Sequence, residues 1–142
     1  MYQLRPAKTT DYEFLYQLKV ACLKEYVAAT WGWDKTYQRE HFAAHFDPDL
    51  IQIVVVNGRD VGQLSVMDDE NGVQISGVYI LPEFQNQGLG TTILGDVIEE
   101  ARKGRQPASL QVLKVNPARR LYERLGFVVV AESETHFQMR LR

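Results

Sequence analysis

The stretch VQISGVYILPEFQNQGLGTTIL, residues 73–94, decides the fold because it places a strand, a glycine turn and a helix in direct succession. Residues 73–81 are rich in β-branched side chains and end before Pro82, a pattern that predicts a strand. Apolar side chains then recur at three- and four-residue spacing over 91–103, which predicts an amphipathic helix. The turn between the two elements is the first candidate for a binding site.

Gly88 and Gly90 permit a tight turn and a close approach of the backbone to a ligand. The helix that follows offers unpaired N–H groups and the positive end of its dipole, which suit a phosphate or pyrophosphate. The side chains at 85–87 are neutral, so the backbone would do most of the binding. Taken alone, the pattern is equally typical of an ordinary turn. It is no Walker loop, because no Gly-Lys-Ser/Thr follows, and no dinucleotide fingerprint, because Ile93 stands where a third Gly or Ala belongs.

The rest of the chain predicts an α/β fold with a mixed sheet, in the order β-α-α-β-β-β-α-β-α-β-β. The expected elements besides 73–81 and 91–103 are a strand 2–5 stopped by Pro6, a helix capped by Thr9 or Thr10 that frays near 30–33, a helix 34–46, strands 51–56 and 61–67 joined by an Asn57-Gly58 hairpin turn, a strand 110–115, a helix 117–125 with Asn116 as its N-cap, and strands 127–131 and 137–141.

Composition narrows the class of protein. A chain of 142 residues predicts one domain, 1–142, and its 45% hydrophobic and 24% charged residues are ordinary for a globular protein. The net charge of −2 gives no support for binding nucleic acid. No apolar run approaches the length of a membrane span or a signal peptide, so we expect no membrane association and a cytoplasmic location. The single cysteine, Cys22, cannot form an internal disulfide and is expected in a helical core.

Two motifs carry a resemblance to a known family. Residues 75–91 resemble the signature of the GNAT superfamily of N-acetyltransferases, in which a strand and a proline precede Gln/Arg-x-x-Gly-x-Gly/Ala at the start of a helix. Residues 115–127, VNPARRLYERLGF, are similar to the family's Asn-x-x-Ala-x-x-x-Tyr-x-x-x-Gly-Phe stretch. The resemblance implies a single GNAT-type domain with a mixed, mostly antiparallel central sheet of about six to seven strands and about four helices. It also implies acetyl-CoA as the acyl donor.

The resemblance assigns cofactor-binding residues. The preceding strand would pair with the pantetheine arm, and Gly77 would ease the opening of the sheet there or simply mark a bulge. Asn116 would reach the pantetheine, cap a helix, or do both. The implied pyrophosphate residues are Gln85, Asn86, Gln87, Gly88, Leu89, Gly90 and Thr91, and the implied pantetheine residues are Val78, Tyr79, Ile80 and Asn116.

The expected reaction is direct attack of a neutral amine on the acetyl thioester. Tyr122 occupies the position of the family's general acid, whereas its alternative role is packing in the core. A backbone N–H of strand 78–81 would stabilise the carbonyl oxygen. The general base is not identifiable; each candidate is more typical of a surface charge. The candidates are Glu25, Asp34, Glu40, His41, Asp68, Asp69 and Glu83.

The acceptor is expected near the end of the first long helix. Aromatic and acidic side chains there suit a cationic amine, although the two tryptophans could equally cap the core. His41 and His45 stand at i and i+4, but no third ligand follows at a recognisable spacing, so we predict no metal. The residues proposed to bind the acceptor are Glu25, Tyr26, Trp31 and Trp33.

These patterns together predict an N-acetyltransferase that acts on a primary amine of a small molecule. A protein or peptide N-acetyltransferase is the alternative acceptor class. A non-catalytic acyl-CoA-binding regulatory module is the alternative from another class, which the presence of Tyr122 argues against. Family members often form dimers, so a homodimer is an additional expectation from the resemblance.

Overall fold

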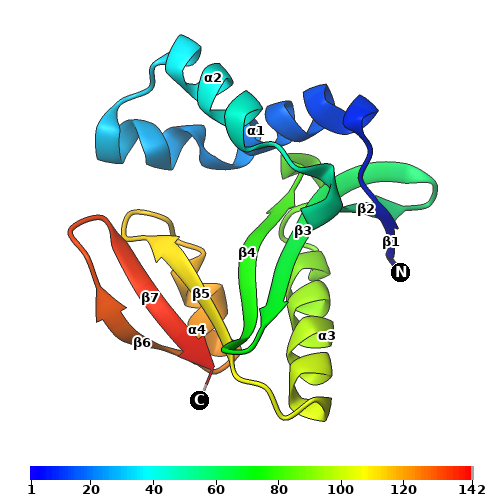
Figure 1. The fold of residues 1–142 in the computed structure, drawn as a ribbon, viewed down its shortest axis with the longest axis vertical. Coiled ribbons are helices and arrows are strands. Elements are labelled where there is room, and N and C mark those ends of the chain that lie inside the picture. The colour runs from blue at the N-terminus through cyan, green and yellow to red at the C-terminus, as the bar shows by residue number, and fades with distance from the viewer. Residues whose placement is uncertain (142) are drawn as a thin grey trace. The chain divides into compact units, whose positions relative to one another are not determined.

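The computed structural model describes residues 1–141 and contains the eleven main elements in the expected order (Figure 1). Three short 3-10 turns lie between them, η1 (Thr9–Asp11), η2 (Pro48–Leu50) and η3 (Pro82–Phe84). The helices are α1 (Tyr12–Trp31), α2 (Lys35–His45), α3 (Leu89–Lys103) and α4 (Arg119–Arg124). The strands are β1 (Gln3–Pro6), β2 (Gln52–Val56), β3 (Arg59–Asp69), β4 (Gly72–Ile80), β5 (Ala108–Leu113), β6 (Phe127–Glu132) and β7 (His136–Leu141).

The strands form one sheet in the order β1-β2-β3-β4-β5-β7-β6. β1, β2 and β3 pair antiparallel, as do β5, β7 and β6, whereas β4 and β5 run parallel with Val73 opposite Ala108. The parallel pair follows from the chain's path, because α3 carries it back before β5 begins. The predicted mixed, mostly antiparallel sheet of about six to seven strands with about four helices is confirmed, with seven strands and four helices in the described residues.

The described chain falls into two compact units. The first comprises Met1–Ser65 and Gly77–Gln85, and the second comprises Val66–Ser76 and the chain from Asn86 onward. The first unit therefore contains α1, α2 and the end of β4, and the second contains α3, β5, α4 and the β6–β7 hairpin.

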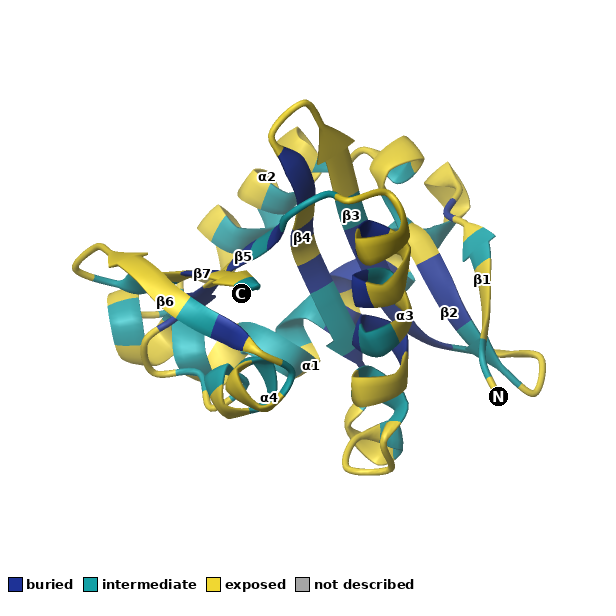
Figure 2. Cartoon of the chain, turned by 90° about the horizontal axis from the view of Figure 1, so that it is seen from below, coloured by how far each residue is buried: buried dark blue, intermediate teal, exposed yellow. Residues whose placement is uncertain are grey.

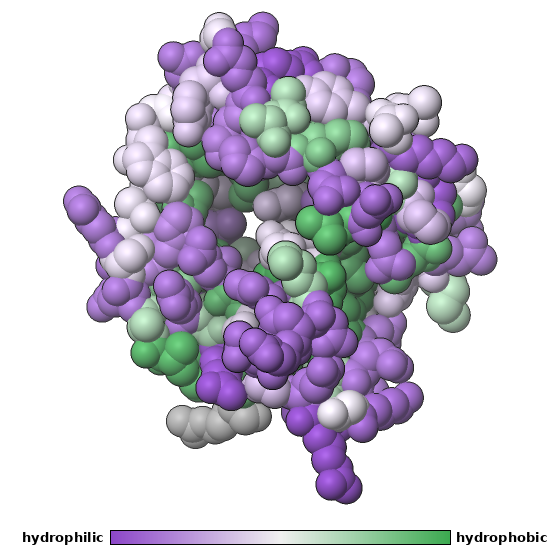
Figure 3. Space-filling view, in the orientation of Figure 1, coloured by the Kyte–Doolittle hydropathy of each residue, from purple (hydrophilic) through white to green (hydrophobic). Residues whose placement is uncertain are grey.

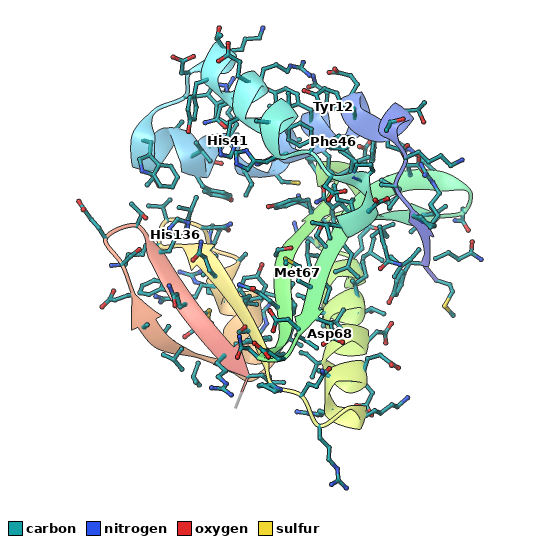
Figure 4. All side chains as sticks on the ribbon, in the orientation of Figure 1. Tyr12, His41, Phe46, Met67, Asp68 and His136 are labelled. Carbon is teal, nitrogen blue, oxygen red and sulfur yellow. The ribbon has the colours of Figure 1, made fainter. Side chains whose placement is uncertain are left out.

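The first unit is held together in part by α1 and α2, which lie side by side in Figure 1. Tyr12 on α1 meets Phe42 and Phe46 edge to face, with ring centroids 5.1 and 5.2 Å apart, and Figure 4 shows Tyr12 and Phe46 as neighbours. Leu15 and Leu18 of α1 are buried with Ile53 of β2 in one core cluster. Hydrophilic side chains prevail at the top of Figure 3, where α2 lies.

The second unit is built on α3 and the strands that follow it. Figure 2 shows buried and exposed residues alternating along α3 with helical spacing, while β6 is mostly exposed. Phe127 at the start of β6 and Met139 of β7 are fully buried. The buried residues of α3 are Ile93, Leu94, Ile98 and Ala101.

Three local predictions are wrong in detail. Pro6 does not stop β1 but pairs with Gln52 as its last residue, which is possible because β1 is an edge strand and needs no N–H there. Neither Thr9 nor Thr10 caps α1. Its N-cap is Asp11, whose carboxylate binds the Arg5 guanidinium and accepts from the Lys8 amide at 2.8 Å.

The third difference is the start of α4, which begins at Arg119 rather than at Pro117. Asn116 Oδ1 accepts a hydrogen bond from the Ala118 amide at 2.9 Å, so the Asn side chain closes a turn ahead of the helix.

Within the part of the chain that the structure describes, no helix is long and apolar enough to span a membrane.

Candidate functional site

The glycine turn adopts the tight backbone that its sequence predicts. Gly88 is the N-cap of α3 with φ 82° and ψ 0°, and Asn86 also has a left-handed φ of 62°. A Cβ built on Gly88 would meet no atom within 4 Å, so the space beside this residue is open. A left-handed glycine facing open space at a helix start is a cradle that an anion can enter and a side chain would fill.

The first turn of α3 supplies the donors for such an anion. Thr92 is the first residue whose amide bonds back to the chain, to the Gly88 carbonyl at 3.0 Å. The amides of Leu89, Gly90 and Thr91 precede it, at the positive end of a helix of 15 residues. The amides of residues 89–91 therefore lie at a helix N-terminus, a place where backbone groups can hold an anion.

The end of β4 lies against β3 without an intervening side chain. A Cβ on Gly62 would lie 2.5 Å from the Tyr79 carbonyl oxygen and 2.8 Å from Ile80 Cδ1. Gly77 has a similar role, because its Cβ would lie 3.1 Å from the ring of Tyr79. Both glycines thus leave room for residues 79 and 80. Gly62 was not singled out from the sequence. The available signal was a lone glycine inside a predicted strand, which often marks a close backbone approach.

One of the amides proposed to stabilise the acyl oxygen is already occupied. The Leu81 N–H donates to the Val61 carbonyl at 2.8 Å. The Leu81 amide is therefore removed from the candidates for stabilising the acyl oxygen.

The carbonyl of Ile80, at the end of β4, accepts two side-chain hydrogen bonds. The Gln85 Nε2 donates to it at 2.8 Å, and the Cys22 Sγ donates at 3.2 Å. Cys22 is therefore half-buried beside the end of β4, and this burial raises the pKa of its thiol.

The second motif lies in the second unit, together with the glycine turn. Gly90 and Leu121 are in contact, since a Cβ on Gly90 would lie 3.9 Å from Leu121 Cδ2. Tyr122 follows Leu121 on α4, and its ring meets Phe127 edge to face at 6.2 Å. Burial raises the pKa of the Tyr122 phenol, so its hydroxyl stays protonated and can act as a donor at neutral pH.

The proposed acceptor residues lie where α1 passes into α2. Glu25 and Trp31 are exposed, the latter to 60%, while Tyr26 and Trp33 are half-buried. The Lys24 ammonium lies 5.7 Å from the centre of the Trp33 ring, so a cation of the chain itself already occupies one face of that ring. Of the two tryptophans, Trp31 is the more accessible.

The rings of the two histidines on α2 stack on each other. The rings of His41 and His45 are 4.2 Å apart, and His45 Nδ1 lies 2.9 Å from the His41 carbonyl oxygen. In the described residues no three His, Cys, Asp or Glu side chains are grouped as metal ligands.

Comparison with known proteins identifies the family. Residues 47–129, more than half of the chain, match the family described as the acetyltransferase (GNAT) domain. The chain belongs to this family. The assignment confirms the family expected from the sequence, the GNAT acetyltransferases.

Two curated relatives agree with it. An uncharacterized N-acetyltransferase of Methanocaldococcus jannaschii is 30% identical over 122 residues, which cover 74% of this chain and 54% of the relative. The [ribosomal protein bS18]-alanine N-acetyltransferase of Haemophilus influenzae is 31% identical over 118 residues, covering 82% of this chain and 75% of that protein. The chain therefore spans about half the length of the Methanocaldococcus jannaschii relative.

A solved structure agrees on the fold. The PaiA N-acetyltransferase of Thermoplasma acidophilum, crystallised in complex with coenzyme A, aligns with a TM-score of 0.80 over 100% of this chain and 99% of that chain. Its sequence identity is 16%, so the likeness supports the fold alone.

Proposed function

We propose that this protein transfers the acetyl group of acetyl-CoA to a primary amine. The observation that carries the proposal is the left-handed Gly88 at the start of α3, with open space beside it and the amides of residues 89–91 ahead of the first helical hydrogen bond. Gln85–Thr91 would bind the pyrophosphate mainly through backbone groups. Val78, Tyr79, Ile80 and Asn116 would bind the pantetheine arm.

Tyr122 is proposed as the general acid. The acetyl thioester supplies an electrophilic carbonyl and a thiolate leaving group. The amine nitrogen forms a bond to that carbonyl carbon as the C–S bond breaks. The Tyr122 hydroxyl gives its proton to the departing sulfur, and a base or water takes the proton of the amine. Burial raises the pKa of Tyr122 and so opposes proton transfer to a thiolate, which means that the role depends on orientation of the hydroxyl toward the departing sulfur.

The acceptor is proposed to be a primary amine of a small molecule that binds beside the end of α1. The exposed Trp31 and the exposed carboxylate of Glu25 on α1 support this choice, because aromatic faces and negative charges each attract an ammonium group before it is deprotonated.

A peptide α-amine is the second candidate acceptor. The observation in its favour is the Haemophilus influenzae relative, whose name assigns it to the alanine of ribosomal protein bS18.

The test is release of free thiol from acetyl-CoA in the presence of single acceptors. A panel of polyamines and aminoglycosides represents small amines, and short peptides with different first residues represent protein termini. Turnover with small amines alone supports the first candidate, and turnover with peptides alone supports the second. Tight coenzyme A binding without turnover on any acceptor would instead favour the non-catalytic module.

Two further expectations stay predictions. The family resemblance favours a homodimer, which sedimentation velocity would detect as twice the mass of the chain. The cytoplasmic location follows only from sequence composition, and fractionation of the source cell would check it.

A further inference from the structure

The structure gives the side chain of Gln85 a role other than binding phosphate. We propose that Gln85 is a positioning residue whose amide holds the Ile80 carbonyl, so that the end of β4 keeps the backbone conformation that receives the pantetheine arm. The inference rests on the proposed function, which assigns residues 78–80 to that arm.

Both polar groups of the peptide between Ile80 and Leu81 are engaged. Its carbonyl accepts from Gln85 Nε2 at 2.8 Å and from Cys22 Sγ at 3.2 Å, and its N–H donates to the Val61 carbonyl at 2.8 Å. The next residue, Pro82, has no N–H and a fixed φ. The orientation of this peptide is therefore set by three partners, from α1, β3 and the residue that begins the glycine turn.

The 3-10 turn η3 makes the Gln85 contact possible. The Phe84 amide donates to the Leu81 carbonyl at 2.8 Å and the Gln85 amide to the Pro82 carbonyl at 3.2 Å, so the chain folds back on itself after β4. The side chain of Gln85 thereby reaches a carbonyl five residues earlier. A glutamate side chain has the same length but only accepts hydrogen bonds. A methionine side chain has nearly the same length and neither donates nor accepts hydrogen bonds strongly.

Ile80 is 7% exposed, so its carbonyl has little access to water if its partners are removed. A buried carbonyl without a donor favours a rotated peptide that finds one elsewhere. With Gln85 present, the Ile80 carbonyl is satisfied by the protein, and the Gln85 amide is committed to it rather than to phosphate oxygens.

This assignment predicts which part of coenzyme A binds more weakly when Gln85 is replaced. The effect should fall on the pantetheine half of coenzyme A, because Gln85 acts through the end of β4. A direct contact to phosphate would instead weaken every ligand that carries the phosphates.

The test compares two ligands on the full chain by titration calorimetry. Coenzyme A carries both the phosphates and the pantetheine arm, whereas adenosine 3′,5′-bisphosphate ends before the arm. Q85M removes the donor at nearly constant length. Q74M is the matched control, an exposed glutamine earlier on the same strand.

Q85M is expected to weaken coenzyme A about tenfold, the equivalent of one hydrogen bond, and adenosine 3′,5′-bisphosphate less than about twofold. Q74M should bind both ligands as the wild type does. C22A removes the second donor and should weaken coenzyme A less than Q85M. The double variant should lose more than the product of the two single losses, because only then does the Ile80 carbonyl lack both side-chain donors.

Three results would overturn the inference. An equal loss of affinity for both ligands in Q85M would mean that Gln85 touches the phosphates. No loss of affinity for either ligand would mean that the bond to Ile80 has no effect on coenzyme binding. Wild-type protein that binds neither ligand would overturn the proposed function and this inference with it. Thermal unfolding of each variant separates these results from a general loss of structure.

Discussion

Replacing Gly88 by alanine tests whether the glycine turn binds the coenzyme or is only a turn. Gly88 has φ 82°, and a Cβ added to it would meet nothing within 4 Å. Gly58, in the hairpin turn between β2 and β3, is a matched control, because its φ is 79° and its Cβ would also meet nothing within 4 Å. The two substitutions therefore impose the same backbone strain with no clash inside the protein.

The expected change in stability follows from these dihedrals. A side chain in the left-handed region costs about 1–2 kcal/mol, and the smaller entropy of the unfolded chain returns about 0.4–1 kcal/mol. The net loss is about 1 kcal/mol, which lowers the Tm of a domain of this size by roughly 4 °C. G88A and G58A should show this shift to the same extent.

Their effects on the cofactor should differ. The Cβ of G88A would enter the open space beside the amides of residues 89–91, where we place the pyrophosphate. We expect titration calorimetry to show coenzyme A affinity at least about tenfold weaker, or about 1.4 kcal/mol. G58A should bind coenzyme A as the wild type does.

The reasoning fails if G88A binds coenzyme A within about twofold of the wild type while its Tm falls as much as that of G58A. In that case the left-handed glycine serves only the turn, and the pyrophosphate lies elsewhere. Loss of coenzyme affinity in G58A as well would show that the effect is one of stability and not of the site.

Three further predictions address the reaction and the fold. Tyr122→Phe should lower turnover on the order of a hundredfold and leave coenzyme A affinity unchanged, since it removes only the donated proton; unchanged turnover would remove its role as the acid. Gly62→Ala should lower stability by about 1–3 kcal/mol in urea unfolding, because its Cβ would lie 2.5 Å from the Tyr79 carbonyl oxygen. An unaltered urea midpoint would contradict the close approach of β3 to β4. The Arg5 guanidinium holds the pKa of Asp11 below its usual range, so stability should fall as the pH drops below the unfolded value of about 3.9. Asp11→Asn should be less stable at neutral pH by about 1 kcal/mol and should lose less stability in acid. Parallel curves of stability against pH for the two proteins would disprove the coupling.

The sign of the acid effect follows from the proton balance of Asp11. Below its ordinary pKa the unfolded chain binds a proton at this carboxyl while the folded chain does not, so acid favours unfolding. The stability that the Arg5 bond contributes is present above the unfolded pKa and disappears as the pH falls through the lower, folded value.

The order of elements could be predicted because the signals for it are local. The apolar spacing over 91–103 and the β-branched run 51–56 before the Asn57-Gly58 turn indicate period and type within a few residues. The hairpin turn is confirmed by the left-handed conformations of Asn57 and Gly58. The family, too, followed from two motifs within short windows, and the match over 47–129 confirms it.

Helix starts were predicted less well, because several residues near each start could serve as the cap. Thr9, Thr10 and Asp11 are all acceptable by type, and in the structure the N-cap is Asp11, whose carboxylate binds the Arg5 guanidinium of β1. At α4 the Asn116 side chain bonds to the Ala118 amide, so the helix begins later than its sequence indicates.

The sequence by itself determined the class of protein and the glycine turn, because both depend on residues close together in the chain. Only the tertiary structure decided what surrounds the end of β4. Gly62 admits the Tyr79 carbonyl there, and Cys22 and Gln85 hold the Ile80 carbonyl. Cys22 lies 58 residues from Ile80 in the chain. No local pattern encodes such a contact, because it arises only when the packing of α1 on the strands brings the two residues together.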